Sequence, residues 1–342
     1  MKYLVGGILL FASTTAAAQG PVTPLFASDA PIQFTIQGPI NSIVRTAEHS
    51  PTTVPATLSL AGSAEVHAIR LTPRGISRRR KETCDFPPLR VELAQPAAAT
   101  SLFKGQRRLK LVTHCRSSSG FQQHLLLEYA AYRMFNLLTP LSYRARLATV
   151  SYVEANGKNL TTRLGFFIED LDDVARRNGM RPAVVADRIS SQQLEARQAA
   201  RVALFQYMIG NLDWSMRAGP AGEGCCHNSR LLSGATAAMV PVPYDFDYSG
   251  MVDAPYAIPP EQIRVNSVRT RVYQGYCRHN GAALAAAAEF RAARPSIESS
   301  FSQIPAMEDR TRRKALSYLS RFFEDIATDQ SLQSRVLKGC MG

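Results

Sequence analysis

The first part of the chain alternates apolar and polar side chains in short segments, and turn residues separate these segments. This pattern predicts short strands from about residue 20 to residue 93, most clearly at 65–71 and 89–93. A turn is predicted at 74–77, after the first of these two strands. Another strand is predicted at 108–113, where long basic side chains alternate with apolar ones. The N-terminal part is therefore expected to be rich in β-structure.

The spacing of apolar residues then changes to a helical period. Residues 121–138 read FQQHLLLEYAAYRMFNLL, which predicts a helix that ends at Thr139-Pro140. Two strands are expected to follow, at 146–153 and 164–169. The Asn156-Gly157 pair between them is typical of a hairpin turn. One helix is thus embedded between predicted strands.

Helical spacing dominates the second half of the chain. A helix is predicted from about 192 to 209, and a strand at 239–244 leads into acidic residues. The rest is expected to be helical, with one apolar stripe formed by Leu316, Leu319, Phe322, Phe323 and Ile326. A β-rich region with one embedded helix (19–170), followed by a helical region (171–342), is the layout of an α+β, protein-kinase-like fold with two lobes. We therefore expect that fold class.

The first eighteen residues are arranged like a cleavable secretory signal peptide. Lys2 provides a positive start, residues 4–12 form a short apolar run, and Ala16-Ala17-Ala18 is a typical cleavage site. Cleavage after Ala18 would leave a mature chain that begins at Gln19. No later segment is long and apolar enough to predict a membrane span. The expected location is secreted or periplasmic.

Composition and charge narrow the range of partners. The chain has 342 residues, of which 45% are hydrophobic and 20% charged, as in a packed globular protein. The formal net charge of +13 favours anionic partners such as phosphate groups, acidic substrates or an anionic membrane surface. Nucleic acid is disfavoured because no basic motif is interleaved with aromatic residues.

Six cysteines fit an oxidising compartment, where pairing stabilises a fold: Cys84, Cys115, Cys225, Cys226, Cys277 and Cys340. They allow 15 pairings, and the sequence does not choose among them. A zinc site at Cys225-Cys226-His227 is disfavoured because adjacent residues chelate one ion poorly. We expect these two cysteines to form disulfides with distant partners.

Acidic and amide side chains at the ends of predicted elements are the candidates for catalysis. Asp213 follows the helix predicted at 192–209, and Asn228 lies further along the chain. Asp245 and Asp247 follow the strand predicted at 239–244. Phosphoryl transfer needs oxygen ligands for a metal, a carboxylate near the acceptor hydroxyl and a cation for the phosphates. The residue types and their order match these needs.

These motifs resemble a known family. In chain order, GNLDW, HN and VPYDFDYSG look like the motifs of the CotH spore-coat kinases and, more distantly, of HipA-type kinases. The segment LLLEYAAYRMFNLLTPLSYRARLATVSYVEANGK, then LGFFIED, resembles that family's helix, strand, Asn-Gly turn and Glu-ended strand. RGISRRR resembles its RGxS turn. The resemblance covers about residues 70–250 and rests on the order of the motifs.

The resemblance implies a role for each matching residue. Asp213 would be the catalytic acid that faces the acceptor hydroxyl, and Asn228 and Asp245 would bind Mg²⁺. Asp247 would be a second metal ligand or a structural carboxylate. Glu169 would lie at the edge of the nucleotide pocket. ATP and Mg²⁺ are the implied cofactors.

The cation that positions the phosphates is where this sequence departs from the family. The family has a Lys-Lys pair after the RGxS turn, whereas this chain has the basic run 78–81, in which Arg79 is a candidate cofactor ligand. We assign phosphate positioning to Lys110, with Glu128 as its ion-pair partner. Glu128 falls on an apolar helical stripe with Leu125 and Tyr132, where a buried charge needs a cation. Alternatively, Glu128 lies at the rim of the stripe in water.

The leading hypothesis is an exported atypical kinase that transfers a phosphoryl group from ATP-Mg²⁺ to a protein or small-molecule hydroxyl. A second hypothesis is an inactive kinase-fold protein that binds an anionic envelope ligand or nucleotide. A third is a disulfide-stapled structural protein without a ligand. Geometry separates them, because a catalyst must bring Asp213, Asn228 and Asp245 together around one metal position.

Overall fold

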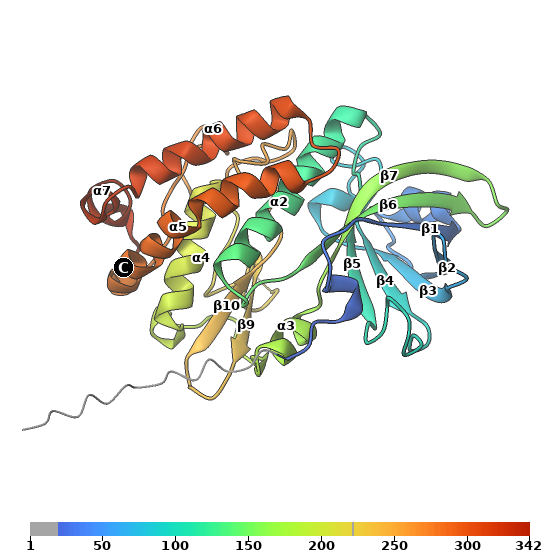
Figure 1. The fold of residues 1–342 in the computed structure, drawn as a ribbon, viewed down its shortest axis with the longest axis horizontal. Helices are drawn as coiled ribbons and strands as arrows, with labels where there is room; N and C mark the ends of the chain where they lie inside the picture. Colours follow the sequence, from blue (N-terminus) through green and yellow to red (C-terminus); the bar gives the residue numbers. More distant parts are fainter. Residues whose placement is uncertain (1–19, 221) are drawn as a thin grey trace, which may run out of the picture.

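The computed structural model describes residues 20–220 and 222–342, and in it a β-barrel adjoins a mainly helical part. Figure 1 shows the barrel strands on one side of the molecule and helices α4 to α7 on the other, with helix α2 between them. The predicted signal peptide, residues 1–18, lies outside the described residues.

Seven strands close the barrel in the order β1-β2-β3-β4-β5-β7-β6. Their bounds are β1 (Ile32–Gly38), β2 (Val54–Leu60), β3 (Val66–Pro73), β4 (Leu89–Leu93), β5 (Arg108–Val112), β6 (Ala145–Glu154) and β7 (Asn159–Ile168). Neighbouring strands pair antiparallel, except that β1 pairs parallel with β6. The strand expected at 164–169 thus begins five residues earlier, at Asn159.

The closed barrel shows that the expectation of a protein-kinase-like fold with two lobes was wrong. Strand β1 alternates buried and more exposed residues, and its Phe34 and Ile36 point into the barrel core. The Phe34 ring stacks on Phe167 of β7, with 5.1 Å between the ring centroids. Because β1 pairs with both β2 and β6, the sheet closes on itself and does not form the sheet of a typical kinase lobe. The fold is instead mixed α/β.

The helices are α1 (Ile40–Thr46), α2 (Gln122–Leu138), α3 (Leu171–Arg177), α4 (Ala196–Ile209), α5 (Asn280–Ser300), α6 (Asp309–Asp325) and α7 (Asp329–Arg335). Helix α5 packs against both α4 and α2. The apolar stripe predicted near the C-terminus lies on α6, where it buries Leu319, Phe322 and Phe323. No helix in the described ranges is both long and apolar enough to cross a membrane.

A small sheet lies beside α4, in the order β10-β9-β8. Its strands are β8 (Arg181–Pro182), β9 (Ser229–Ser233) and β10 (Met239–Pro243), and β9 pairs antiparallel with both neighbours. The apolar alternation predicted β10 but not β9, which lies in a segment that reads as a polar loop. This sheet carries several of the candidate residues at its ends.

All six cysteines form disulfides: Cys84–Cys115, Cys225–Cys226 and Cys277–Cys340. The expectation of distant partners for Cys225 and Cys226 was wrong, because these neighbours bond to each other and neither is left for a third group. Disulfides are typical of proteins in oxidising compartments. The first bridge joins the segment after the predicted RGxS turn to the segment after β5.

Candidate active site

The loop after helix α4 holds Asp213 in place. Gly210 ends the helix in the left-handed region, with φ of 65°, and a Cβ there would collide with the hydroxyl of Tyr318. Asn211 is completely buried, and its Oδ1 accepts a hydrogen bond from the Asp213 main-chain N at 3.0 Å. Trp214 Nε1 donates to the Asn211 carbonyl oxygen at 3.1 Å. These bonds fix the backbone from which the Asp213 side chain projects.

Two neighbouring side chains orient the Asp213 carboxylate. His227 Nε2 lies 2.7 Å from Oδ1, and Asn228 Nδ2 donates to Oδ2 at 3.0 Å. Asn228 Nδ2 also donates to the Asp213 carbonyl oxygen at 2.7 Å. The hydrogen bond to Asp213 raises the pKa of His227 above its ordinary value. Because the Asp213 side chain is still 30% exposed, an oriented carboxylate faces solvent.

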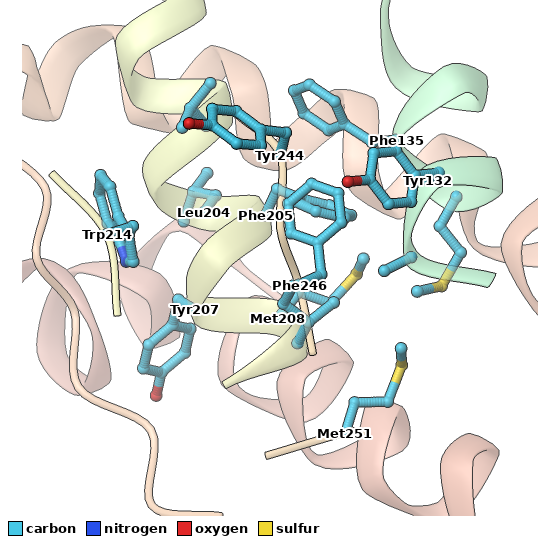
Figure 2. Packing of buried hydrophobic residues seen from close by; sticks show 14 of the residues in the cluster. Tyr132, Phe135, Leu204, Phe205, Tyr207, Met208, Trp214, Tyr244, Phe246 and Met251 are labelled. Carbon is cyan, nitrogen blue, oxygen red and sulfur yellow. The ribbon is translucent and has the colours of Figure 1, made fainter. Parts of the chain in front are cut away.

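Phe246 anchors the two acids that follow strand β10. Its side chain is completely buried, between Tyr132 of α2 and Phe205 of α4, with centroid distances of 4.7 and 5.4 Å (Figure 2). The main-chain N of Asp245 donates to the Tyr132 hydroxyl at 2.9 Å. Packing of one aromatic ring therefore sets the positions of both Asp245 and Asp247.

Asn228 and Asp245 lie at the paired ends of two neighbouring strands. Strand β9 begins after Asn228, and Asp245 follows the end of β10, which pairs antiparallel with β9. The Tyr244 main-chain N donates to the Asn228 carbonyl oxygen at 3.0 Å. Both residues have positive φ, 47° and 63°, a backbone conformation that Asn and Asp tolerate better than most residues. The structure therefore brings Asp213, Asn228 and Asp245 to one end of the small sheet.

A buried arginine lies among three carboxylates next to this group. The Arg78 guanidinium contacts Glu128 at 3.2 Å, Asp245 at 2.6 Å and Asp247 at 3.3 Å. Arg78, Glu128 and Asp247 are only 6%, 2% and 4% exposed. Tyr256 donates its hydroxyl to Asp247 at 2.9 Å. We call Glu128, Asp245 and Asp247 the acidic triad.

Burial and Arg78 act in opposite directions on the acidic triad. Burial raises the pKa of Glu128 and of Asp247, because desolvation disfavours the ionised form, although the Arg78 charge opposes this. At Asp245 burial also acts to raise the pKa, but Arg78, Arg74 and other cations together hold it below its ordinary value. Asp245 is therefore the member of the triad that stays ionised most readily.

The predicted ion pair between Lys110 and Glu128 was wrong. Glu128 of α2 faces the turn that carries Arg78, and this guanidinium neutralises it. Lys110 of β5 instead places its Nζ 4.5 Å from the ring centroid of Tyr244 and 5.6 Å from that of Tyr143. The prediction that Glu128 is buried and has a cationic partner is correct, but the cation comes from a different element.

Lys110 should make the stability of the protein depend on pH. Desolvation, with the nearby Arg74 charge, lowers the pKa of Lys110 from 10.5 to about 7, while Asp170 and Asp245 oppose the shift. Between these values the unfolded chain binds the proton and the folded chain does not, so stability rises with pH. Compared with Lys110→Met, the wild type should gain up to about 1.4 kcal/mol per pH unit in this window.

Denaturant unfolding of both proteins across this pH range tests the expectation. Lys158→Met serves as the control because Lys158 is exposed in the β6–β7 turn, and its curve should run parallel to that of the wild type. Parallel curves for Lys110→Met and the wild type would show instead that the Lys110 ammonium is fully solvated.

Two further candidates, Arg79 and Glu169, make contacts inside the protein. Arg79 donates to the carbonyl oxygens of Gly75 at 2.6 Å and Ala47 at 3.3 Å, which stabilises the turn. Glu169 is completely buried and accepts hydrogen bonds from Arg177 Nε at 3.0 Å and Nη2 at 3.1 Å. The Glu169 carboxylate is thus paired with Arg177 inside the protein, and its place at the edge of a nucleotide pocket stays a prediction.

Two residues that complete the site, Arg78 and His227, could be found only in part from sequence patterns. Arg78 stood in the basic run 78–81, but nothing in the run shows that the 3₁₀ turn Ser77–Arg79 directs this one residue inward. His227 is adjacent to Asn228, a candidate metal ligand, but the sequence pattern indicated no role for it.

A cavity of about 940 Å³ opens between the β4–β5 connection and the start of α3. Its lining includes Arg108 and Asp170, which form an ion pair at 3.6 Å. Arg108 is two residues before Lys110 on β5, so both side chains lie on the same face of the strand. The cavity therefore opens beside the strand that carries Lys110, and its volume suits a small organic ligand.

The site combines an oriented, solvent-facing carboxylate, a second carboxylate at a strand end and several cations. Such a set can accept a proton from a hydroxyl and bind an anion or a hard cation. No protein-family model matches this sequence, and no curated protein sequence matches it.

Proposed function

We propose that the protein transfers a phosphoryl group from ATP-Mg²⁺ to the hydroxyl of a protein or small molecule. One observation carries the proposal. Asp213 is hydrogen-bonded to Asn228, and Asn228 lies next to Asp245 at the paired ends of β9 and β10. Asp213 would accept the proton of the hydroxyl as its oxygen bonds to the terminal phosphorus. The bond from that phosphorus to the bridging oxygen breaks, and the nucleoside diphosphate leaves.

The donor set around Asp245 fits a magnesium ion. Mg²⁺ prefers carboxylate and amide oxygens, and its charge would neutralise phosphate oxygens when it is bound. Because Asn228 Nδ2 donates to Asp213, the carbonyl oxygen of the same amide is the atom that remains for a cation. Arg78 and Tyr256 both contact Oδ2 of Asp247, which leaves its Oδ1 for the same purpose. Asn228, Asp245 and Asp247 would therefore hold the metal.

The position of Arg78 favours a second candidate function, an inactive protein that binds an anionic ligand. The guanidinium contacts all three carboxylates of the acidic triad, whose ligand atoms lie within 4.8 Å of one another. A divalent cation at the same atoms would have to displace it. A protein that keeps Arg78 there permanently would lack the metal needed for transfer and would bind an anionic ligand through its other cations.

We further propose that the protein acts outside the cytoplasm, secreted or periplasmic. The three disulfides and the signal-peptide pattern of residues 1–18 support this location. The motif order that resembles the CotH kinases supports the same class of reaction.

Nucleotide binding and turnover of the purified chain test the proposal. ATP with Mg²⁺ should raise the melting temperature more than ATP or Mg²⁺ alone, and labelled phosphate should pass from ATP to water or to the protein itself. Asp213→Asn should keep the thermal shift but slow the transfer at least about 100-fold, because the proton acceptor is lost. Asp187→Asn, at an exposed site, is the matched control.

The outcomes separate the two candidate functions. A thermal shift without transfer in the wild type would reject the phosphotransferase and support the binding protein. The absence of any shift with ATP, with or without Mg²⁺, would contradict both.

A further inference from the structure

Two basic side chains, from Lys110 and Arg230, lie over the ring of Tyr244 next to Asp245. Lys110 Nζ lies 4.5 Å from the ring centroid of Tyr244, and the guanidinium carbon of Arg230 lies 5.5 Å from the same centroid. Arg74, in the turn after β3, is close enough for its charge to act on Lys110, Tyr244 and Asp245. The three cations come from β5, from β9 and from the turn after β3.

These cations have few partners inside the protein. The side chains of Lys110 and Arg74 make no hydrogen bond or ion pair with any residue in the described ranges, and Arg230 donates only to the Cys226 carbonyl oxygen, at 3.3 Å. The nearest carboxylates are already engaged, because Asp245 binds Arg78 and Asp170 binds Arg108. Without a counter-ion, burial disfavours the protonated form of Lys110 and lowers its pKa to about 7. A bound anion would favour that form, so this place is short of negative charge.

We propose that Lys110, Arg230 and Arg74 form an anion subsite against Tyr244 that binds a chain of linked phosphates. Arg230 is exposed, Arg74 and Lys110 are partly buried, and Tyr244 is buried, so the subsite leads from the surface inward. Arginine forks and a lysine point charge suit phosphate oxygens, and several linked phosphates can contact cations on separate elements. The choice of phosphate rests on the proposed function, whereas the charge imbalance does not.

Calorimetry with tripolyphosphate in the presence of EDTA tests the subsite without metal or catalysis. The wild type should bind, and Lys110→Met and Arg230→Gln should each weaken binding about 10-fold or more, as expected for loss of a charged hydrogen bond. Lys158→Met and Arg45→Gln remove exposed charges elsewhere and should leave the affinity unchanged. Circular dichroism confirms that each variant is folded.

Further ligands identify the source of the phosphates. ATP that binds more tightly than tripolyphosphate, with the same loss in both variants, would assign the subsite to a nucleotide; equal affinities would assign it to free polyphosphate. Either result supports the subsite. Equal competition by sulfate at matched ionic strength, or unchanged affinity in both variants, would overturn it. If tripolyphosphate binds as expected and no phosphoryl transfer occurs, the subsite stands and the phosphotransferase does not.

Discussion

Replacement of Arg78 by methionine should destabilise the protein by about 3–5 kcal/mol, because it leaves buried carboxylates without their counter-ion. Arg78 is the cation that contacts Glu128, Asp245 and Asp247, and two of these acids are almost completely buried. Equilibrium unfolding in urea measures the loss. The stability of Arg78→Lys should lie between that of the wild type and that of Arg78→Met. An ammonium keeps the charge but cannot contact three carboxylates as a guanidinium does.

Arg79→Met is the matched control for this experiment. Its side chain donates to main-chain carbonyl oxygens, so its removal should cost only about 1 kcal/mol. A divalent cation gives a second readout: Mn²⁺ should stabilise Arg78→Met more than the wild type, since the acidic triad is then free to bind it. Equal stability of Arg78→Met and the wild type at neutral pH would contradict the assigned role.

Replacement of Arg177 by methionine should have an effect of similar size, about 3–5 kcal/mol, on the free energy of unfolding. Arg177 and Glu169 are 2% and 0% exposed, and they form a two-bond ion pair. Arg177 also donates to the carbonyl oxygens of Pro140 and Ser142, so its loss leaves several buried acceptors unpaired. Burial raises the pKa of Glu169, with the Arg177 hydrogen bond opposing it.

The neighbouring Arg176 provides the control, because its side chain is 52% exposed and pairs with Asp173 near the surface. Arg176→Met should cost less than about 1 kcal/mol. Adding Glu169→Gln to Arg177→Met should recover part of the stability, since the stranded charge is removed. If nucleotide affinity fell in Arg177→Met while unfolding was unchanged, Glu169 would belong to the ligand pocket after all.

Most element positions could be predicted from apolar periodicity, but the closure of the barrel could not. Strand β4 was predicted with its observed bounds, and α2 within one residue. Periodicity reports which face of a strand is buried but does not identify the strand beside it. The parallel pairing of β1 with β6 depends on such a long-range partner, so the layout alone pointed to the wrong fold.

The candidate site could be predicted where each residue lies at the end of an element. It could not be predicted where residues from distant elements contact one another. Asp213, Asn228 and Asp245 stand at element ends, and the structure brings them together there. The partner of Glu128 depended on which residue of the 78–81 run turns inward, which is set by one short 3₁₀ turn. Lys110 and Arg230 contact the Tyr244 ring only through tertiary packing, so no spacing along the chain could reveal these contacts.

The parallel pairing that closes the barrel also governs how the chain must fold. Ile32 of β1 pairs beside Ala148 of β6, and strands β2 to β5 and helix α2 lie between these two positions in the chain. Contacts between such distant segments form slowly, because the loss of chain entropy precedes the gain from pairing. Until they form, β1 and β6 each present an unpaired edge that another chain can join. The kinetic hazard of this fold is therefore the interval before closure, when intermolecular pairing competes with the final step.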